Sequence, residues 1–137
     1  MKRLAIFVGA VILLAGACSD DAGVGGGAPP PGSPKEAAVI VVNHPQPGDR
    51  VLSPVAISGD ANVFEATVSI RILDASGAVI AEDFTTATCG TGCRGTYSTK
   101  VAFDVSSEQA GTIEVFESSA EDGSQLFLVS IPVTLVP

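Results

Sequence analysis

The sequence has little of what enzyme sites are built from. Among its 137 residues there is no Trp, one Tyr and one His, and charged residues make up only 16%. Nucleophilic catalysis would require His44 beside a serine and an orienting acid, but His44 precedes Pro45 in a predicted turn, where a histidine is expected to be solvated. The chain also has no glycine-rich phosphate loop. We therefore expect no catalytic residues, no cofactor and no metal.

Positive charge is scarce as well. The sequence has 7 Lys and Arg against 15 Asp and Glu, and two of the basic residues, Lys2 and Arg3, stand at the extreme N-terminus. Without its first 17 residues the chain keeps 5 basic and 15 acidic groups, a formal charge of −10. Such a charge repels phosphate backbones and anionic lipid headgroups. The composition therefore argues against a nucleic-acid partner.

No apolar run reaches the roughly 20 residues that a membrane-spanning helix needs. The first 17 residues, MKRLAIFVGAVILLAGA, instead have a positive end, an apolar stretch over residues 4–14 and a small-residue exit, which are the three parts of an export signal. The next letter completes LLAGAC, which resembles the lipobox of bacterial lipoproteins. The resemblance implies cleavage between Ala17 and Cys18 and a diacylglycerol on Cys18. The alternative is an ordinary secretory signal in which Cys18 is incidental.

Residues 19–36 are almost without apolar side chains, and Val24 is the one of any size. They contain five Gly and four Pro among eighteen residues, a composition that cannot bury enough surface to offset the entropy of ordering. We expect a disordered spacer that holds a domain off the membrane, and any linker would have the same composition. The predicted organisation is a signal peptide over 1–17, a lipidated cysteine and linker over 18–36, and one domain over 37–137.

No helical period follows the signal, and the remaining chain consists of short β-rich stretches separated by turn residues. In the clearest stretch, apolar residues from Phe64 to Ile72 alternate with polar ones. Seven strands are predicted, over residues 37–42, 50–59, 64–73, 78–84, 96–105, 111–119 and 126–136. Such regular spacing predicts an all-β fold, an immunoglobulin-like β-sandwich of about seven strands. Without Trp or a cysteine pair spanning the sheets, this describes architecture and not kinship with antibodies.

Three segments carry a resemblance to a known family. They are HPQPGDRVLSPVAISGDANVFEATVSIRILDASGAVI (44–80), GTIEVFESSAEDGS (111–124) and VSIPVTL (129–135). Together they look like the immunoglobulin-like domain of bacterial spore germination proteins, over nearly all of residues 38–136. The resemblance implies an envelope or sporulation context and offers no catalytic residues.

The sequence of these segments also predicts local structure. Pro47-Gly48-Asp49 is expected to make the turn into the second strand, with Pro54 at an edge or bulge position and Gly59 at the strand's end. Phe64 is expected to anchor the core. Asp122-Gly123 suits a hairpin turn.

Two of the three cysteines lie close together in TTATCGTGCRGT, residues 85–96. Cys89 and Cys93 are spaced one residue wider than a C-x-x-C redox motif, and they offer two of the four ligands that structural zinc requires. Outside the cytoplasm thiols tend to oxidise. The predicted export therefore favours a Cys89–Cys93 disulfide, a local staple that contributes about 2 kcal/mol.

Two further polar groupings are less informative. Glu65 and Arg71 share the polar face of one predicted strand, which is either a solvated face or a binding face. The acidic turn at residues 121–124 is too short to supply the roughly 6–8 oxygens that calcium takes.

The sequence thus predicts a lipoprotein on the extracytoplasmic face of the membrane, in the cell envelope. Its domain would bind or scaffold an envelope protein or a cell-wall component, in spore germination or in envelope assembly. The alternative is an accessory substrate-binding module of an envelope enzyme. An enzyme should show polar groups converging in a deep pocket, whereas a binding module should show a flat face or an exposed sheet edge.

Overall fold

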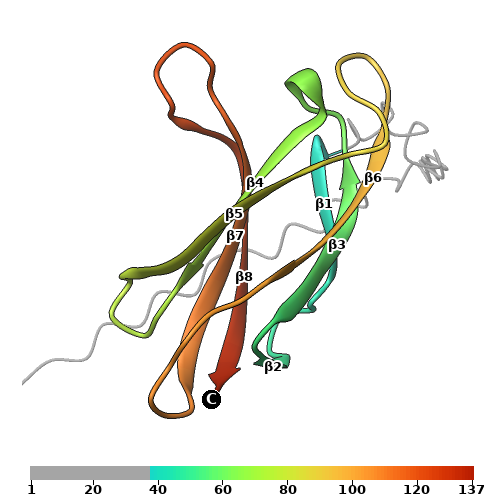
Figure 1. Cartoon of the computed structure of the whole chain (residues 1–137). Helices are drawn as coiled ribbons and strands as arrows, with labels where there is room; N and C mark the ends of the chain where they lie inside the picture. Colours follow the sequence, from blue (N-terminus) through green and yellow to red (C-terminus); the bar gives the residue numbers. More distant parts are fainter. Residues whose placement is uncertain (1–37) are drawn as a thin grey trace, which may run out of the picture. The chain divides into compact units, whose positions relative to one another are not determined.

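The structure is a computed structural model, and it describes residues 38–137 (Figure 1). The predicted signal peptide, the lipidation site at Cys18 and the linker over 18–36 lie outside the described residues. The described residues belong to one unit, Glu36–Pro137. In this part of the chain no helix is both long enough and apolar enough to cross a membrane.

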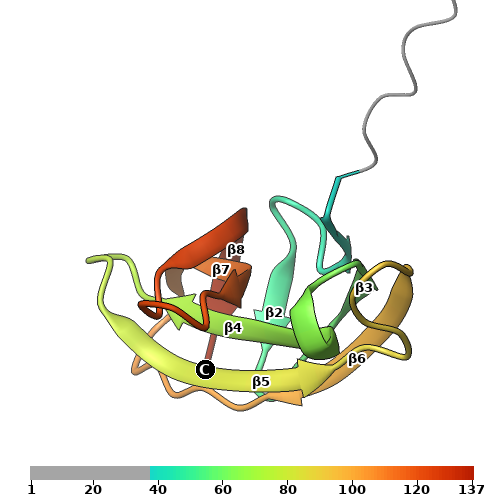
Figure 2. The same ribbon diagram turned by 90° about the horizontal axis from the view of Figure 1, so that it is seen from above.

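Eight strands form two sheets that pack face to face (Figures 1 and 2). The strands are β1 (Ile40–His44), β2 (Arg50–Leu52), β3 (Val55–Ala61), β4 (Thr67–Leu73), β5 (Val79–Thr86), β6 (Gly95–Val101), β7 (Gln109–Ser118) and β8 (Gln125–Val136). One sheet has the order β1-β3-β6 and the other the order β2-β8-β7-β4-β5. Neighbouring strands are antiparallel except β2 and β8, which are parallel. The predicted all-β, immunoglobulin-like β-sandwich is confirmed, since two mainly antiparallel sheets packed face to face are the immunoglobulin architecture.

There is one strand more than predicted, because the expected strand over 50–59 is divided at Ser53-Pro54. Proline has no N–H to donate and cannot continue a ladder. The chain changes sheets there, with β2 pairing to β8 and β3 pairing to β1 and β6. Pro54 is therefore not an edge or bulge residue within a strand, as predicted, but the residue between two strands.

Gly59 does not end its strand, contrary to prediction. It lies inside β3, opposite Val42 on one side and Tyr97 on the other. The Tyr97 hydroxyl reaches across it and donates to the carbonyl oxygen of Val41, 3.0 Å away. Burial, with a smaller effect from the Asp60 carboxylate, raises the pKa of Tyr97. A side chain at position 59 would collide with the Val41 carbonyl and the Tyr97 hydroxyl, so the close approach of the strands requires glycine.

Phe64 is not a core anchor, and this prediction was wrong. Residues Phe64–Ala66 form a short 3-10 helix, η1, in which Glu65 and Ala66 have φ of 53° and 59°. These left-handed residues interrupt the period-two alternation, so Phe64 is left 52% exposed. Val63 is buried instead. The strand begins at Thr67, three residues later than predicted.

The core is built from the alternating residues of both sheets. In the five-stranded sheet, Ile72 of β4 lies opposite Ile113 of β7, which lies opposite Ile131 of β8, and all three are buried. The neighbouring row is Ile70, Val115 and Val129. The opposite sheet contributes Ile40, Val55, Ile57, Tyr97 and Val101. A continuous apolar layer between two sheets is what holds a sandwich together.

The predicted turns are present. Gly48 has φ of 88°, and the Asp49 amide donates to the Gln46 carbonyl at 3.1 Å. Gly123 has φ of 73° in the turn between β7 and β8. The predicted strand over 96–105 ends early, at Val101, although Phe103 and Val105 beyond it are buried as expected.

Candidate binding face

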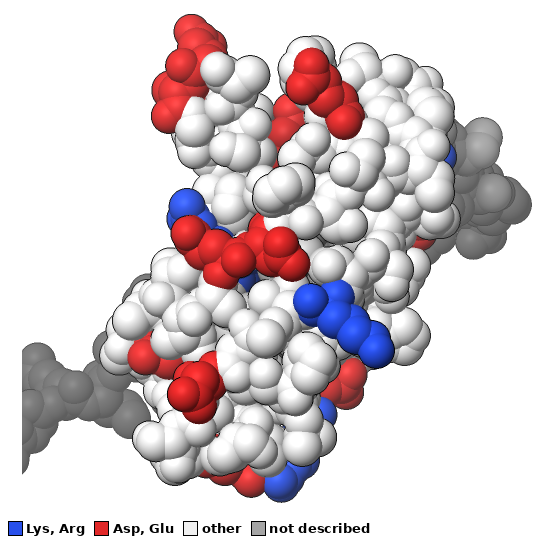
Figure 3. Space-filling model, viewed as in Figure 1, with Lys and Arg blue, Asp and Glu red and all other residues white. Residues whose placement is uncertain are grey.

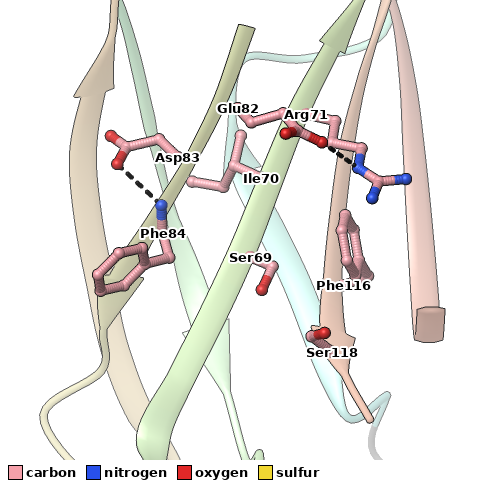
Figure 4. A pocket seen from close by; sticks show the side chains of 8 residues that line it. All are labelled: Ser69, Ile70, Arg71, Glu82, Asp83, Phe84, Phe116 and Ser118. Atoms are coloured by element: carbon pink, nitrogen blue, oxygen red, sulfur yellow. Dashed lines mark hydrogen bonds and ion pairs between the residues drawn. The ribbon is translucent and has the colours of Figure 1, made fainter. Parts of the chain in front are cut away.

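A hollow of about 350 Å³ lies on the five-stranded sheet, across β4, β5 and β7 (Figure 4). It is lined by Ser69, Ile70, Arg71, Glu82, Asp83, Phe84, Phe116 and Ser118. The strand register places Phe84, Ser69 and Phe116 in one row, with the serine in the middle. Since neighbouring strands are about 4.8 Å apart, the strands that carry the two phenyl rings are about 10 Å apart. The small serine between them leaves the space open.

One wall of the hollow is held in place by an arginine. The Arg71 guanidinium carbon lies 5.1 Å from the centre of the Phe116 ring, and its Nε donates to Glu82 Oε1 at 2.8 Å (Figure 4). Glu114 of β7 lies opposite Arg71 on the other side, so the cation stands between two acidic positions. Phe116 is only 3% exposed although its side chain is on the face away from the core, and Arg71 lies over its ring.

The other wall is open. Phe84 of β5 is 68% exposed, the highest value among the exposed large apolar side chains of the described residues. Its amide donates to the carboxylate of Asp83 at 2.8 Å. Residues 38–137 carry 12 acidic and 4 basic side chains, and Figure 3 shows acidic groups across the middle of the viewed face and at its upper tips. The hollow thus combines the exposed Phe84 ring with serine, arginine and acidic side chains, on a domain that is acidic as a whole.

The sequence identified only part of this face. Arg71 lies on the polar face of its strand as predicted, and this face lines the hollow, but Glu65 does not share the strand, because it belongs to η1. Phe84 and Phe116 were missed. The signal was present in the alternation: Phe116 falls in phase with Glu114 and Ser118, on the polar side of its strand. A large aromatic residue on a polar face is the pattern that would have pointed to the hollow.

His44 lies apart from this face. It ends β1, is exposed, and lines a second, more open hollow of about 410 Å³ together with Pro45, Asp49, Val51, Leu52, Pro54, Val55 and Ala56. None of these lining residues carries a hydroxyl, thiol or amine nucleophile. The Asp49 carboxylate accepts a hydrogen bond from the Gln46 amide at 2.8 Å, a contact within the turn. The second hollow offers an apolar surface and no set of groups for nucleophilic catalysis.

The structure joins Cys89 to Cys93 in a disulfide within the loop between β5 and β6. The same loop is held by two hydrogen bonds, from the Cys93 amide to the Gly90 carbonyl at 3.0 Å and from the Gly92 amide to Asn62 Oδ1 at 3.1 Å. Gly92 has φ of 88°, which a residue with a side chain adopts only at a cost. The disulfide and these hydrogen bonds together fix the conformation of a short loop.

In the acidic turn between β7 and β8, the Asp122 carboxylate is hydrogen-bonded within the turn itself. Asp122 accepts a hydrogen bond from the Ser124 amide at 2.9 Å. Hydrogen bonding, first from the Ser124 side chain, lowers the pKa of Asp122. Within residues 38–137, no three His, Cys, Asp or Glu side chains come together in a way that would hold a metal ion.

Comparison with known families adds a name to the architecture. The sheet order defines an immunoglobulin-like domain, a non-catalytic fold type. Residues 39–124 match the model of the immunoglobulin-like domain of bacterial spore germination, and the chain belongs to that family. The match ends before β8, which nevertheless pairs with β2 and β7. No curated protein and no solved structure matches the chain.

Proposed function

We propose that this protein is a lipoprotein of the cell envelope whose immunoglobulin-like domain binds a partner during spore germination. Export and cleavage between Ala17 and Cys18 would leave Cys18 acylated and the domain tethered outside the membrane by the linker over 18–36. The observation that carries the binding function is the hollow beside Phe84, since a large apolar side chain left exposed next to a slot marks an interaction site. The family match supports germination as the process.

The anchor makes a first prediction. When the lipoprotein signal peptidase is inhibited in the host, the chain should accumulate with residues 1–17 still attached, because cleavage at Ala17–Cys18 follows acylation. A Cys18→Ala chain should also keep residues 1–17 and carry no acyl chain, because the cleavage depends on the acylated cysteine. Mass spectrometry of the mature N-terminus is the measurement. A secreted chain with an unmodified Cys18 would contradict the proposal.

The binding face makes a second prediction. In a deletion strain, complementation with the wild-type gene or with Leu52→Thr should restore the rate at which spores germinate, and Phe84→Thr should not. Leu52 is the matched control, because it is 62% exposed and lies on the opposite edge strand of the same sheet. Immunoblots of the membrane fraction establish equal amounts of each chain. Normal germination without the gene, or with Phe84→Thr, would contradict the assignment, as would a host that forms no spores.

A further inference from the structure

Each sheet of the domain has two edge strands, and β5 differs from the other three. β2 has three residues and β1 has five, while β6 has seven and presents Thr96, Ser98 and Lys100 as its exposed side chains. Short strands and charged side chains, above all lysine, are common means of preventing further pairing, and on β5 these charges are acidic. β5 has eight residues, and its only neighbour in the sheet is β4. Beyond it the chain turns to β6, where the Thr88 amide donates to the Thr96 carbonyl.

An edge strand offers main-chain donors and acceptors to an additional extended chain, and the Phe84 amide, which donates to the Asp83 carboxylate, would have to exchange that contact for the added strand. The hollow lies next to this edge, on the same sheet, and Phe84 on β5 lines it. On an added strand, the residue opposite Phe84 would point to the same face as Phe84, because side chains of paired strands alternate together. An apolar side chain at that position would cover Phe84 and reach the hollow.

The charges on β5 indicate which kind of strand could pair with this edge. Glu82 and Asp83 are exposed on this strand, and the nearest cation, Arg71, is already paired with Glu82. If a second copy of this chain paired along β5, it would place the same acidic residues opposite or next to one another, which is unfavourable in a sheet. A strand with lysine or arginine beside its apolar residue would place opposite charges there instead.

We propose that β5 binds an extended basic peptide of a partner protein as an additional strand of the sheet, with an apolar side chain of the peptide against Phe84 and the hollow. The inference rests on the proposed function, because both place the binding site on the face that carries Phe84. It goes beyond that function in naming the edge, the mode of binding and the chemistry of the partner.

The test uses the purified chain and a peptide with fluorescein on its N-terminus, fluorescein-Thr-Lys-Lys-Phe-Lys-Lys-Thr-amide, whose symmetric pattern serves either strand direction. Fluorescence anisotropy should show saturable binding that weakens between about 0.05 M and about 0.5 M salt. The same peptide with glutamate in place of lysine should not bind. N-methylation of alternate peptide amides should abolish binding while keeping charge and side chains, because strand addition requires the main-chain N–H groups.

Paired variants separate the edge from general attraction to an acidic protein. Phe84→Thr should weaken binding roughly tenfold, and Leu52→Thr on the opposite edge less than about twofold. Glu82→Gln should weaken it about threefold, whereas Glu108→Gln should not, although each glutamate is paired with an arginine, Glu82 with Arg71 and Glu108 with Arg50.

Several outcomes would overturn the proposal. These are the absence of saturable binding up to about 1 mM peptide, equal binding of the N-methylated peptide, equal loss in the two members of each variant pair, and binding of cell-wall glycan fragments in competition with the peptide. Self-association that depends on Phe84 would point to a second copy instead. If the peptide does not bind but Phe84→Thr still impairs germination, the edge assignment fails and the proposed function stands. If the peptide binds but the Phe84→Thr strain germinates normally, the proposed function fails and the edge assignment stands.

Discussion

Replacing Ile113 by alanine should lower the free energy of unfolding by about 2–5 kcal/mol. Ile113 is fully buried at the centre of the row that it forms with Ile72 and Ile131, so the change removes apolar contacts on both sides and leaves a cavity between the two sheets. Small domains have a total stability of about 5–15 kcal/mol, and the variant should therefore be close to unfolding at 37 °C. Urea denaturation followed by circular dichroism measures the difference.

The size of this effect should depend on burial and volume. Ile113→Val should cost about 0.5–1.5 kcal/mol, because it removes one methyl group and leaves a smaller cavity. Val79→Ala on β5 should cost less than about 0.5 kcal/mol, since Val79 is exposed at the edge of the sheet. Equal losses for Ile113→Ala and Val79→Ala would show that the row of isoleucines is not the centre of the core.

Introducing a methyl group at Gly59 should be about as damaging, at about 3 kcal/mol or more. The new Cβ of Gly59→Ala would overlap the Val41 carbonyl oxygen and lie 2.7 Å from the Tyr97 hydroxyl. β1 must then move away from β3, which also breaks the hydrogen bond from Tyr97 to Val41. Thermal and denaturant unfolding of the purified chain give the measurement.

A second glycine distinguishes crowding from backbone conformation. Gly77 has φ of 83° and open space where an added Cβ would lie, so Gly77→Ala should cost about 1–2 kcal/mol through conformation alone. Adding Tyr97→Phe to Gly59→Ala should not rescue the variant, because the nearest colliding atom is a backbone oxygen. A full rescue by Tyr97→Phe, or a smaller loss for Gly59→Ala than for Gly77→Ala, would show that the strands do not approach as closely as described.

The fold could be predicted from the sequence because period-two alternation is a local property. The alternation from Val68 to Ile72 and in residues 111–115 needs no knowledge of neighbouring strands. The errors arose where the backbone departs from regular extension. Two left-handed residues in η1 turned Phe64 outward, and Pro54 divided one apparent strand between two sheets. Gly59 was misplaced because a tight contact between strands also calls for glycine, as a turn does.

The candidate site was harder to predict, because it depends on register. Phe84, Ser69 and Phe116 belong to three strands, and only the pairing of those strands brings them into one row. Alternation shows which face a residue occupies, but not which residue lies beside it on the next strand. The contact between Arg71 and the Phe116 ring likewise depends on the register between β4 and β7. A one-residue slip would have placed the two rings on opposite faces.

The pairing of β2 with β8 also determines how the domain responds to mechanical force. β1 starts near the top of Figure 1 and β8 ends at the bottom, so a pull on these two ends runs along the strands. The hydrogen bonds between β2 and β8 lie across the direction of this pull, so they share the force. They do not open one by one, as the bonds of an unzipped hairpin do. A domain stretched between those ends therefore stays folded until several bonds fail together.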